Sequence, residues 1–456
     1  MNAAEIIKKD LDAIYIGNLS TVDDNLTLPE NGKYGAQFTW ETGEERFIDN
    51  TGKVHRPLHG MGNRKVILTV TATYEGCSES REYVATVLQE AKENIVKEVR
   101  KVVLNALVGE EAHLPSVVIV YTEDGRRMTM PVKWNTYEPA KEETVVAVAG
   151  VIDGTEKEAS AEIHYKKEIV PVKGPEKKVG YFPLGQVRLK EGTLYYKYQK
   201  LMEEYLLGID DDQMLYNFRK ATGLDTKGAP PMTGWDEESC KLKGHTTGHY
   251  LSGIALAFAA TGNLKFLDKV NYMVAELKKC QDAFAATGKY HRGFLSAYSE
   301  EQFDLLEVYT KYPEIWAPYY TLDKIMSGLY DCHVLAGNET AKEILDLMGD
   351  WVYDRLSRLP KETLDKMWAM YIAGEFGGML GTMVKVYELT GKENHLKAAK
   401  LFENEKLFYP MEEECDTLED MHANQHIPQI IGAMDLYRAT GDEIYWEIGK
   451  NFWNIV

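Results

Sequence analysis

One pattern recurs four times in the C-terminal part of the chain: a helix-forming stretch, a small residue followed by glycine, and a second helix-forming stretch. Glycine directly after a periodic helix is the expected left-handed stop. From Gly337 onward these glycines are 54 and then 50 residues apart, about the length of a helical hairpin with its connection. The repeat predicts a series of antiparallel helical pairs that turn at Gly262, Gly337, Gly391 and Gly441.

Each predicted helix carries one apolar stripe. In one of them, Ile344, Leu347, Met348 and Trp351 follow the i, i+3, i+4, i+7 spacing. Helical pairs with such stripes bury them by stacking on neighbouring pairs. The stack can be an open solenoid or a closed α/α barrel, and a barrel would gather the loops of one end around a pocket.

The N-terminal part has a different period. Up to about Tyr165, short alternating apolar segments are broken by turn residues. Asp124-Gly125 and Asp153-Gly154 are strong hairpin signals, because type I′ turns need positive φ at both central residues. We therefore predict two β-sandwiches, a linker and an all-α domain, with the bounds 1–90, 91–168, 169–181 and 182–456.

Both predicted sandwiches resemble bacterial immunoglobulin-like modules. In each of them a strand tryptophan, Trp40 or Trp134, precedes a glycine-containing return strand. The segment "KKEIVPVKGPEKKVG" (166–180) follows, and its prolines and lysines are typical of an exposed linker.

Composition limits the partners of this chain. The net charge of −19 disfavours nucleic acid and anionic membranes, which need a basic surface. No apolar run is long enough to span a bilayer, and the N-terminus lacks the apolar core of a signal peptide, so localisation stays open. The cysteines form no C-x-x-C pair and are expected to be free thiols: Cys77, Cys240, Cys280, Cys332 and Cys415.

The loops between the helices are rich in histidine, aromatic and acidic residues, a mixture that suits carbohydrate. In "GHTTGHYLSG", His245 and His249 share one helix face. They could bind a metal, contact a sugar or pack in the core, but no third metal ligand is spaced beside them. His422 repeats the i, i+4 spacing with a later histidine, and Asn424 between them either contacts a ligand or caps a helix.

Further candidates stand in the neighbouring loops. Glu375 precedes Gly377 and Gly378, which imply a close approach of backbone or ligand; it could line a pocket or be solvated. Trp316, in "WAPYYT" together with Tyr320, could form a sugar platform or pack in the core. The acidic run 236–238 is interpreted as a solvated helix start.

Six ordered motifs carry a family resemblance. They are "GHTTGHYLSGIALAFAATGN", "GFLSAY", "WAPYYTLDKIMSGLYD", "EFGGM", "HANQHIPQIIGAMDLYRATGD" and "NFWNIV". From about Phe182 to Val456 the chain resembles glycoside hydrolase family 127 and its relative family 146, the β-L-arabinofuranosidase-like enzymes. The resemblance implies an (α/α)6 barrel, and it implies that His249, Glu375 and His422 line an arabinose subsite, with weaker support for His245, Trp316 and Tyr320.

The same resemblance implies a zinc ion held by glutamate and cysteines, one of which is the nucleophile. Those motifs follow the segment that matches "NFWNIV", so we expect no catalytic residue, metal ligand or cofactor in this chain, and an incomplete barrel that is inactive alone and self-associates through uncovered helix faces.

Three functions remain open from the sequence. The first is a retaining glycoside hydrolase that acts on terminal L-arabinofuranose of plant glycans. The second is a non-catalytic carbohydrate-binding or structural protein. The third is another α/α-barrel enzyme, a lyase or an unsaturated glucuronyl hydrolase, which would need basic side chains such as Lys243 and Arg292.

Overall fold

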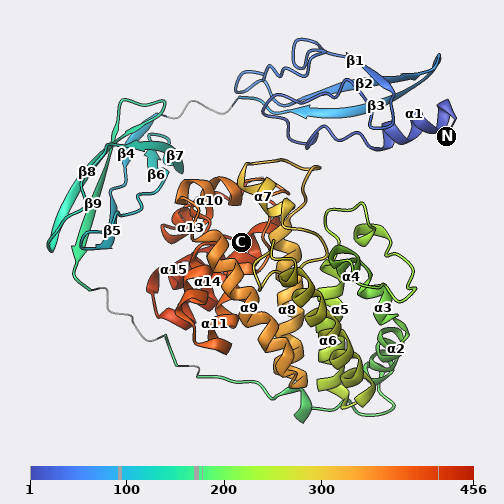
Figure 1. Cartoon of the computed structure of the whole chain (residues 1–456). Helices are drawn as coiled ribbons and strands as arrows, with labels where there is room; N and C mark the ends of the chain where they lie inside the picture. The colour runs from blue at the N-terminus through green and yellow to red at the C-terminus, as the bar shows by residue number, and fades with distance from the viewer. Residues whose placement is uncertain (1, 91–94, 169–173, 177, 420) are drawn as a thin grey trace. The chain divides into compact units, whose positions relative to one another are not determined.

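A computed structural model of the chain describes residues 2–90, 95–168, 174–176, 178–419 and 421–456 (Figure 1). The chain divides into two compact units, Met1–Ile95 and Val96–Val456. Each unit is built around its own apolar core.

The first unit is a three-stranded antiparallel sheet with one helix. Its strands are β1 (Gln37–Thr42), β2 (Arg64–Tyr74) and β3 (Cys77–Val87), in the order β1-β2-β3. In β2 the alternating residues Val66, Leu68, Val70 and Ala72 are all buried on one face. The helix α1 (Ala3–Asp12) packs on β2 and β3. The predicted sandwich is therefore reduced to one sheet, and the helix that covers it was not predicted.

The second module lies at the start of the second unit and forms a six-stranded sheet in the order β4-β6-β7-β8-β9-β5. The paired strands are antiparallel except for β5 and β9. Both predicted hairpins are confirmed, since Asp124-Gly125 joins β6 to β7 and Asp153-Gly154 joins β8 to β9. The strand bounds are β4 (Val96–Val99), β5 (Val102–Leu107), β6 (Val117–Thr122), β7 (Arg127–Trp134), β8 (Thr144–Ile152) and β9 (Glu158–Lys166).

The tryptophan and glycine of this module face each other. Trp134 lies opposite Gly150 in the β7–β8 ladder, and a Cβ added to Gly150 would lie 2.7 Å from the indole ring. The return strand therefore needs glycine so that the ring can lie flat on it. Of the predicted linker 169–181, residues 169–173 and 177 lie outside the described part of the chain.

The helical domain contains the four predicted hairpins (Figure 1). The first helix of each ends at a glycine with φ of 68° to 72°, at Gly262, Gly337, Gly391 and Gly441, as predicted. The pairs are α5 (His245–Thr261) with α6 (Leu264–Ala286), α8 (Pro318–Ala336) with α9 (Glu339–Leu356), α11 (Met379–Thr390) with α12 (Glu393–Lys400), and α14 (Ala423–Thr440) with α15 (Glu443–Ile455).

Further elements precede the first hairpin or lie in the connections between hairpins. They are η1 (Leu184–Gln186), α2 (Leu194–Gly208), α3 (Asp211–Met214), α4 (Tyr216–Thr222), η2 (Gly234–Asp236), α7 (Glu301–Glu307), α10 (Lys361–Trp368) and α13 (Glu405–Glu412).

The first helices of the hairpins form a continuous inner layer, because α8 packs against α5 and α11, and α11 packs against α14. Glycines allow these backbones to approach closely. A Cβ on Gly248 would lie 2.6 Å from the backbone nitrogen of Ile325, and a Cβ on Gly432 would lie 2.9 Å from that of Gly381. The second helices α6, α9 and α12 pack against one another as an outer layer. This is the layering of an α/α barrel.

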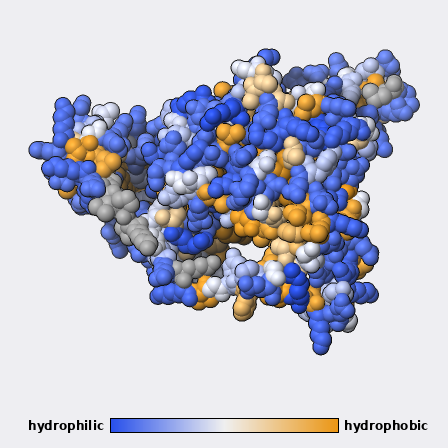
Figure 2. Space-filling view, turned by 60° about the horizontal axis from the view of Figure 1, so that its bottom comes forward, coloured by the Kyte–Doolittle hydropathy of each residue, from blue (hydrophilic) through white to orange (hydrophobic). Residues whose placement is uncertain are grey.

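Part of the apolar surface of this domain is uncovered, and Figure 2 shows apolar residues gathered in a band on the surface. Two groups of exposed apolar side chains belong to α2 and to the last hairpin: Leu194, Tyr195, Tyr198, Leu201, Met202 and Tyr205, and Ile427, Ile431, Trp446, Trp453 and Val456. Among the described residues, no helix has the length and hydropathy needed to cross a membrane.

Candidate functional site

The N-terminal ends of the inner helices α5, α8, α11 and α14 carry the predicted site residues. His245 and His249 lie in the first turns of α5, and Tyr320 lies in the first turn of α8. Glu375 lies just before α11, and His422 is the N-cap residue of α14. Backbone N–H groups that point out of these helix ends favour oxygen acceptors and negative charge in front of them.

The two histidines of α5 meet an aromatic side chain from α8. The ring centroids of His245 and His249 are 6.1 Å apart, and those of His245 and Tyr320 are 6.4 Å apart. His245 is buried, with Nδ1 3.0 Å from the carbonyl oxygen of Leu242. A carbonyl only accepts, so Nδ1 carries the proton and a neutral His245 ring has its acceptor at Nε2.

A buried carboxylate orients His245. Asp236 is only 3 % exposed, and its Oδ2 lies 3.2 Å from Nδ1 of His245. The same carboxylate accepts hydrogen bonds from the backbone N–H of Gly244, at 2.6 Å, and from the hydroxyl of Thr246. The interpretation of the run 236–238 as a solvated helix start is therefore wrong for Asp236, although Glu237 and Glu238 are exposed. Three successive acidic residues in a sequence do not reveal which of them is buried.

A second buried carboxylate joins α8 to α11. Asp323, 2 % exposed, accepts hydrogen bonds from the backbone N–H of Gly378, the N-cap residue of α11, at 3.2 Å and from Thr382 Oγ1 at 2.7 Å. Its Oδ2 also lies 2.9 Å from Nζ of Lys324. A Cβ on Gly377 would lie 3.0 Å from the Tyr320 ring, so the predicted close approach at these glycines is to Tyr320 and Asp323. Asp323 thereby fixes the loop that carries Glu375.

Burial and charged neighbours act on the pKa of Glu375 in opposite directions. Burial raises the pKa of Glu375, while His422 and Lys324 nearby act in the opposite direction. Burial also raises the pKa of Tyr320, against the effect of Lys324. Burial works against the charge of Lys324, yet Asp323 beside it holds the pKa of Lys324 above its usual value. Glu375 is thus a partly desolvated acceptor beside an ammonium group that already has a partner.

His249 and His422 are the more accessible histidines of the site. Burial by surrounding groups, with Lys324 and His245, lowers the pKa of His249, so its ring is neutral at pH 7 and offers one donor and one acceptor. The His422 ring lies edge-on to Tyr371, with centroids 6.3 Å apart. Asn424 lies inside α14 and is not its cap, so the capping hypothesis for Asn424 is wrong.

Trp316 lies at the rim of this site, half-buried directly before α8. Its indole meets the exposed ring of Trp235 edge-on, with centroids 5.8 Å apart. Trp316 is therefore neither fully buried in the core nor fully exposed, and both hypotheses for it, sugar platform and core packing, stay open.

The described residues include one group that could hold a metal ion. Its ligand atoms belong to Asp346, Asp350 and His395. Lys392 occupies the same place, with Nζ 2.6 Å from Asp346 and 3.0 Å from Asp350. The group contains no cysteine, so it does not fit the zinc set that the family resemblance implies.

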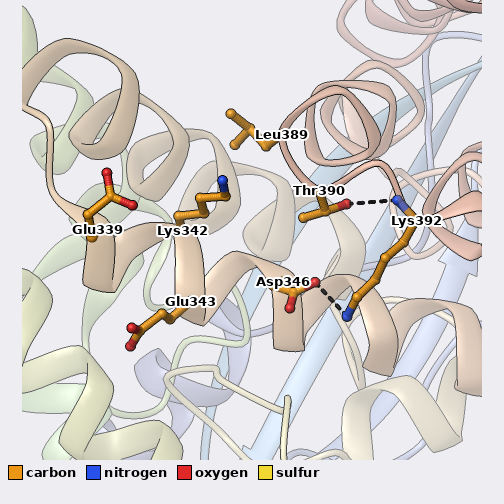
Figure 3. A pocket seen from close by; sticks show the side chains of 7 residues that line it. All are labelled: Glu339, Lys342, Glu343, Asp346, Leu389, Thr390 and Lys392. Atoms are coloured by element: carbon orange, nitrogen blue, oxygen red, sulfur yellow. Dashed lines mark hydrogen bonds and ion pairs between the residues drawn. The ribbon is translucent and has the colours of Figure 1, made fainter.

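This cluster borders a cavity of about 330 Å³ that Figure 3 shows from close by. The cavity lies near the C-terminal end of α11, at the opposite end of that helix from Glu375. It is lined by Glu339, Lys342, Glu343, Asp346, Leu389, Thr390 and Lys392.

The described thiols are free, as predicted. Burial raises the pKa of Cys280 to about 11, and it also raises the pKa values of Cys240, Cys332 and Cys415. A nucleophilic or metal-bound cysteine needs the opposite shift.

The structure adds Asp236, Asp323 and Lys324 to the residues predicted from the sequence. Lys324 directly follows Asp323 in "TLDKIM". In a sequence, an Asp-Lys pair that is buried looks the same as one that is exposed to solvent. Tertiary packing of α8 against α5 and α11 buries it.

Comparison with known proteins gives three family matches. Residues 186–456 match the catalytic domain of β-L-arabinofuranosidase, glycoside hydrolase family 127. Residues 7–90 match an atrophied bacterial Ig domain, and residues 93–155 match a group 4 bacterial Ig-like domain. No curated protein matches the chain.

One similar solved structure is a polysaccharide lyase, with 9% sequence identity and a TM-score of 0.36. The match covers 95% of this chain and 65% of the lyase, so this chain spans less than two thirds of that protein's length. The first family match, in contrast, covers more than half of the 456 residues. The chain belongs to glycoside hydrolase family 127, with two bacterial immunoglobulin-like modules before its helical domain.

Proposed function

We propose that the helical domain recognises a terminal L-arabinofuranose unit of plant glycans, as part of a glycoside hydrolase. The observation that carries this proposal is the grouping of these side chains in front of the inner helix ends: the ring of His249 adjoins that of His245, the ring of His245 adjoins that of Tyr320, and Glu375 interacts electrostatically with Tyr320 and His422. The neutral imidazole of His249 can donate to and accept from sugar hydroxyls, and the Glu375 carboxylate accepts from them. The Tyr320 ring offers an apolar face for sugar C–H groups.

We propose further that the described residues bind the sugar and do not cleave it by themselves. The cysteines of the helical domain have raised pKa values, so they are thiols at neutral pH and weak nucleophiles. A non-catalytic carbohydrate-binding role is the outcome if no turnover accompanies binding.

The lyase alternative receives less support. It requires cations for an acidic sugar, and Lys324 already pairs with Asp323. Of the two basic residues named from the sequence, Arg292 lies 3.5 Å from Asp350 on α9, and Nζ of Lys243 donates to the backbone carbonyl oxygen of Glu238. Each of these cations already has an acceptor within the protein, so none is free for a uronate.

Isothermal titration of the whole chain with methyl β-L-arabinofuranoside tests sugar recognition. We expect binding that weakens about tenfold in His249→Ala, the loss of one or two hydrogen bonds. Glu339→Gln, an exposed residue at the start of α9, is the control and leaves the affinity unchanged. Equal binding of a uronic acid, or no loss in His249→Ala, contradicts the proposal; release of the aglycone from an aryl β-L-arabinofuranoside contradicts binding without cleavage.

We also propose that the protein self-associates through its uncovered apolar helix faces. Trp453 on α15 is 81 % exposed, and Trp446 and Ile431 are exposed on the same hairpin. Apolar patches of this kind mark association sites in soluble proteins.

A further inference from the structure

A row of aromatic rings continues from the proposed sugar site toward solvent. Trp235 lies edge-on to Trp316, with centroids 5.8 Å apart, and Trp316 lies edge-on to Tyr312, with centroids 5.4 Å apart. On its other side Trp235 reaches His245, with centroids 6.2 Å apart. Two ring-to-ring steps of about 6 Å therefore connect Trp235 to His249.

Trp235 is held in place although it is exposed. Its side chain is 64 % exposed, an unfavourable position for a large apolar ring. Its neighbour Asp236 is buried and hydrogen-bonded to Gly244 and Thr246, and Asn217 donates to the carbonyl oxygen of Asp236 at 2.7 Å. The backbone beneath the indole is thus anchored to α4 and α5, and the ring stays presented to solvent.

Trp316 is held in place from the other side of the row. Its backbone N–H donates to Oε1 of Gln302 at 3.3 Å, and Nε2 of Gln302 donates to the carbonyl oxygen of Lys241 at 3.1 Å. The next residue, Ala317, has φ of 43°, in the left-handed region that a side chain disfavours by about 1 kcal/mol. Such backbone strain persists where the surrounding structure over-determines the conformation, here directly after Trp316.

We propose that Trp235, Trp316 and Tyr312 form a second sugar subsite, which holds the unit next to the one bound at His249 and Glu375. The inference rests on the proposed function and extends it from a single sugar to a glycan of at least two units. Fixed aromatic faces pack on sugar C–H groups, and their continuity with His245 places the second unit beside the first. Glu238 pairs with Lys220, while the exposed carboxylate of Glu237 next to Trp235 disfavours an acidic sugar, so the subsite suits a neutral one.

The test compares two ligands in the full chain, methyl β-L-arabinofuranoside and a β-L-arabinofuranosyl disaccharide, by isothermal titration. We expect the disaccharide to bind about tenfold more tightly, the gain of one stacked ring. Trp235→Ala removes that gain and leaves the affinity for the single sugar within twofold, while Trp235→Phe keeps part of the gain. Trp453→Ala, which removes another exposed indole, on α15, is the matched control and leaves both affinities unchanged.

The outcomes separate the two proposals. An unchanged disaccharide gain in Trp235→Ala, or the same loss in Trp453→Ala, overturns the second subsite while single-sugar binding still supports the proposed function. Disaccharide binding that weakens in Trp235→Ala but not in His249→Ala overturns the proposed site and supports the aromatic subsite. Absence of binding by either sugar to the unmodified chain overturns both.

Discussion

Asp323 connects the stability of the helical domain to the shape of the site. Its carboxylate accepts from Gly378 and Thr382 and pairs with Lys324, so its loss leaves buried donors and an ammonium group without an acceptor. We expect Asp323→Ala to lower the free energy of unfolding by about 2–4 kcal/mol. Asp323→Asn keeps one acceptor and should cost about half as much. Urea unfolding measures both, and a change below about 0.5 kcal/mol in Asp323→Ala would refute the role.

Glu375 should show a conflict between stability and binding. Burial raises its pKa above the usual value of 4.5, so the folded state prefers the protonated carboxyl. That contribution to stability is present below the unfolded pKa and is lost as pH rises through the folded pKa. Glu375→Gln has no titrating proton at this position. We therefore expect the difference in melting temperature, variant minus unmodified protein, to increase from pH 4 to pH 7, while the affinity for sugar falls. A melting temperature that falls relative to the unmodified protein over this range contradicts the assignment.

At the scale of elements, the crossing of α5 and α8 depends on Gly248. A Cβ on Gly248 would overlap the backbone of Lys324 and Ile325, so Gly248→Ala must push α8 away. We expect a loss of about 1–3 kcal/mol in the free energy of unfolding, and weaker sugar binding because Tyr320 moves with α8.

Gly253 provides the matched control in the same helix. A Cβ there would meet Leu206 at 3.5 Å, an ordinary contact. Gly253→Ala should therefore leave stability unchanged or raise it by up to about 1 kcal/mol, the helix preference of alanine. Equal losses in the two variants would show that the α5–α8 distance does not set the effect.

For the whole molecule, the uncovered faces of α2 and the last hairpin predict self-association. Trp453→Lys places a charge in an apolar contact, so we expect the dissociation constant of the oligomer to rise about tenfold or more. Sedimentation velocity over a range of concentrations measures this. Val84→Lys, on the exposed side of β3 in the first unit, is the control, and a monomer at all concentrations of the unmodified chain would exclude the proposal.

The sequence by itself determined the order of the domains and the turns that join their hairpins. Hairpin glycines such as Gly125 and Gly337, and alternation such as that of Val66 and Leu68, act through local backbone geometry, which neighbouring residues specify. The same local logic failed for α1, because a helix of ten residues is marginal alone and forms here by packing on β2 and β3.

Only the tertiary structure decided which residues of the site are buried and which are open. Asp236 and Glu237 are adjacent and both acidic, yet one is hydrogen-bonded in the interior and the other is in solvent. Trp235 and Trp316 are 81 positions apart, yet their rings meet. Burial and contact depend on residues distant in the chain, brought together when α5, α8, α11 and α14 pack with their N-terminal ends at one place.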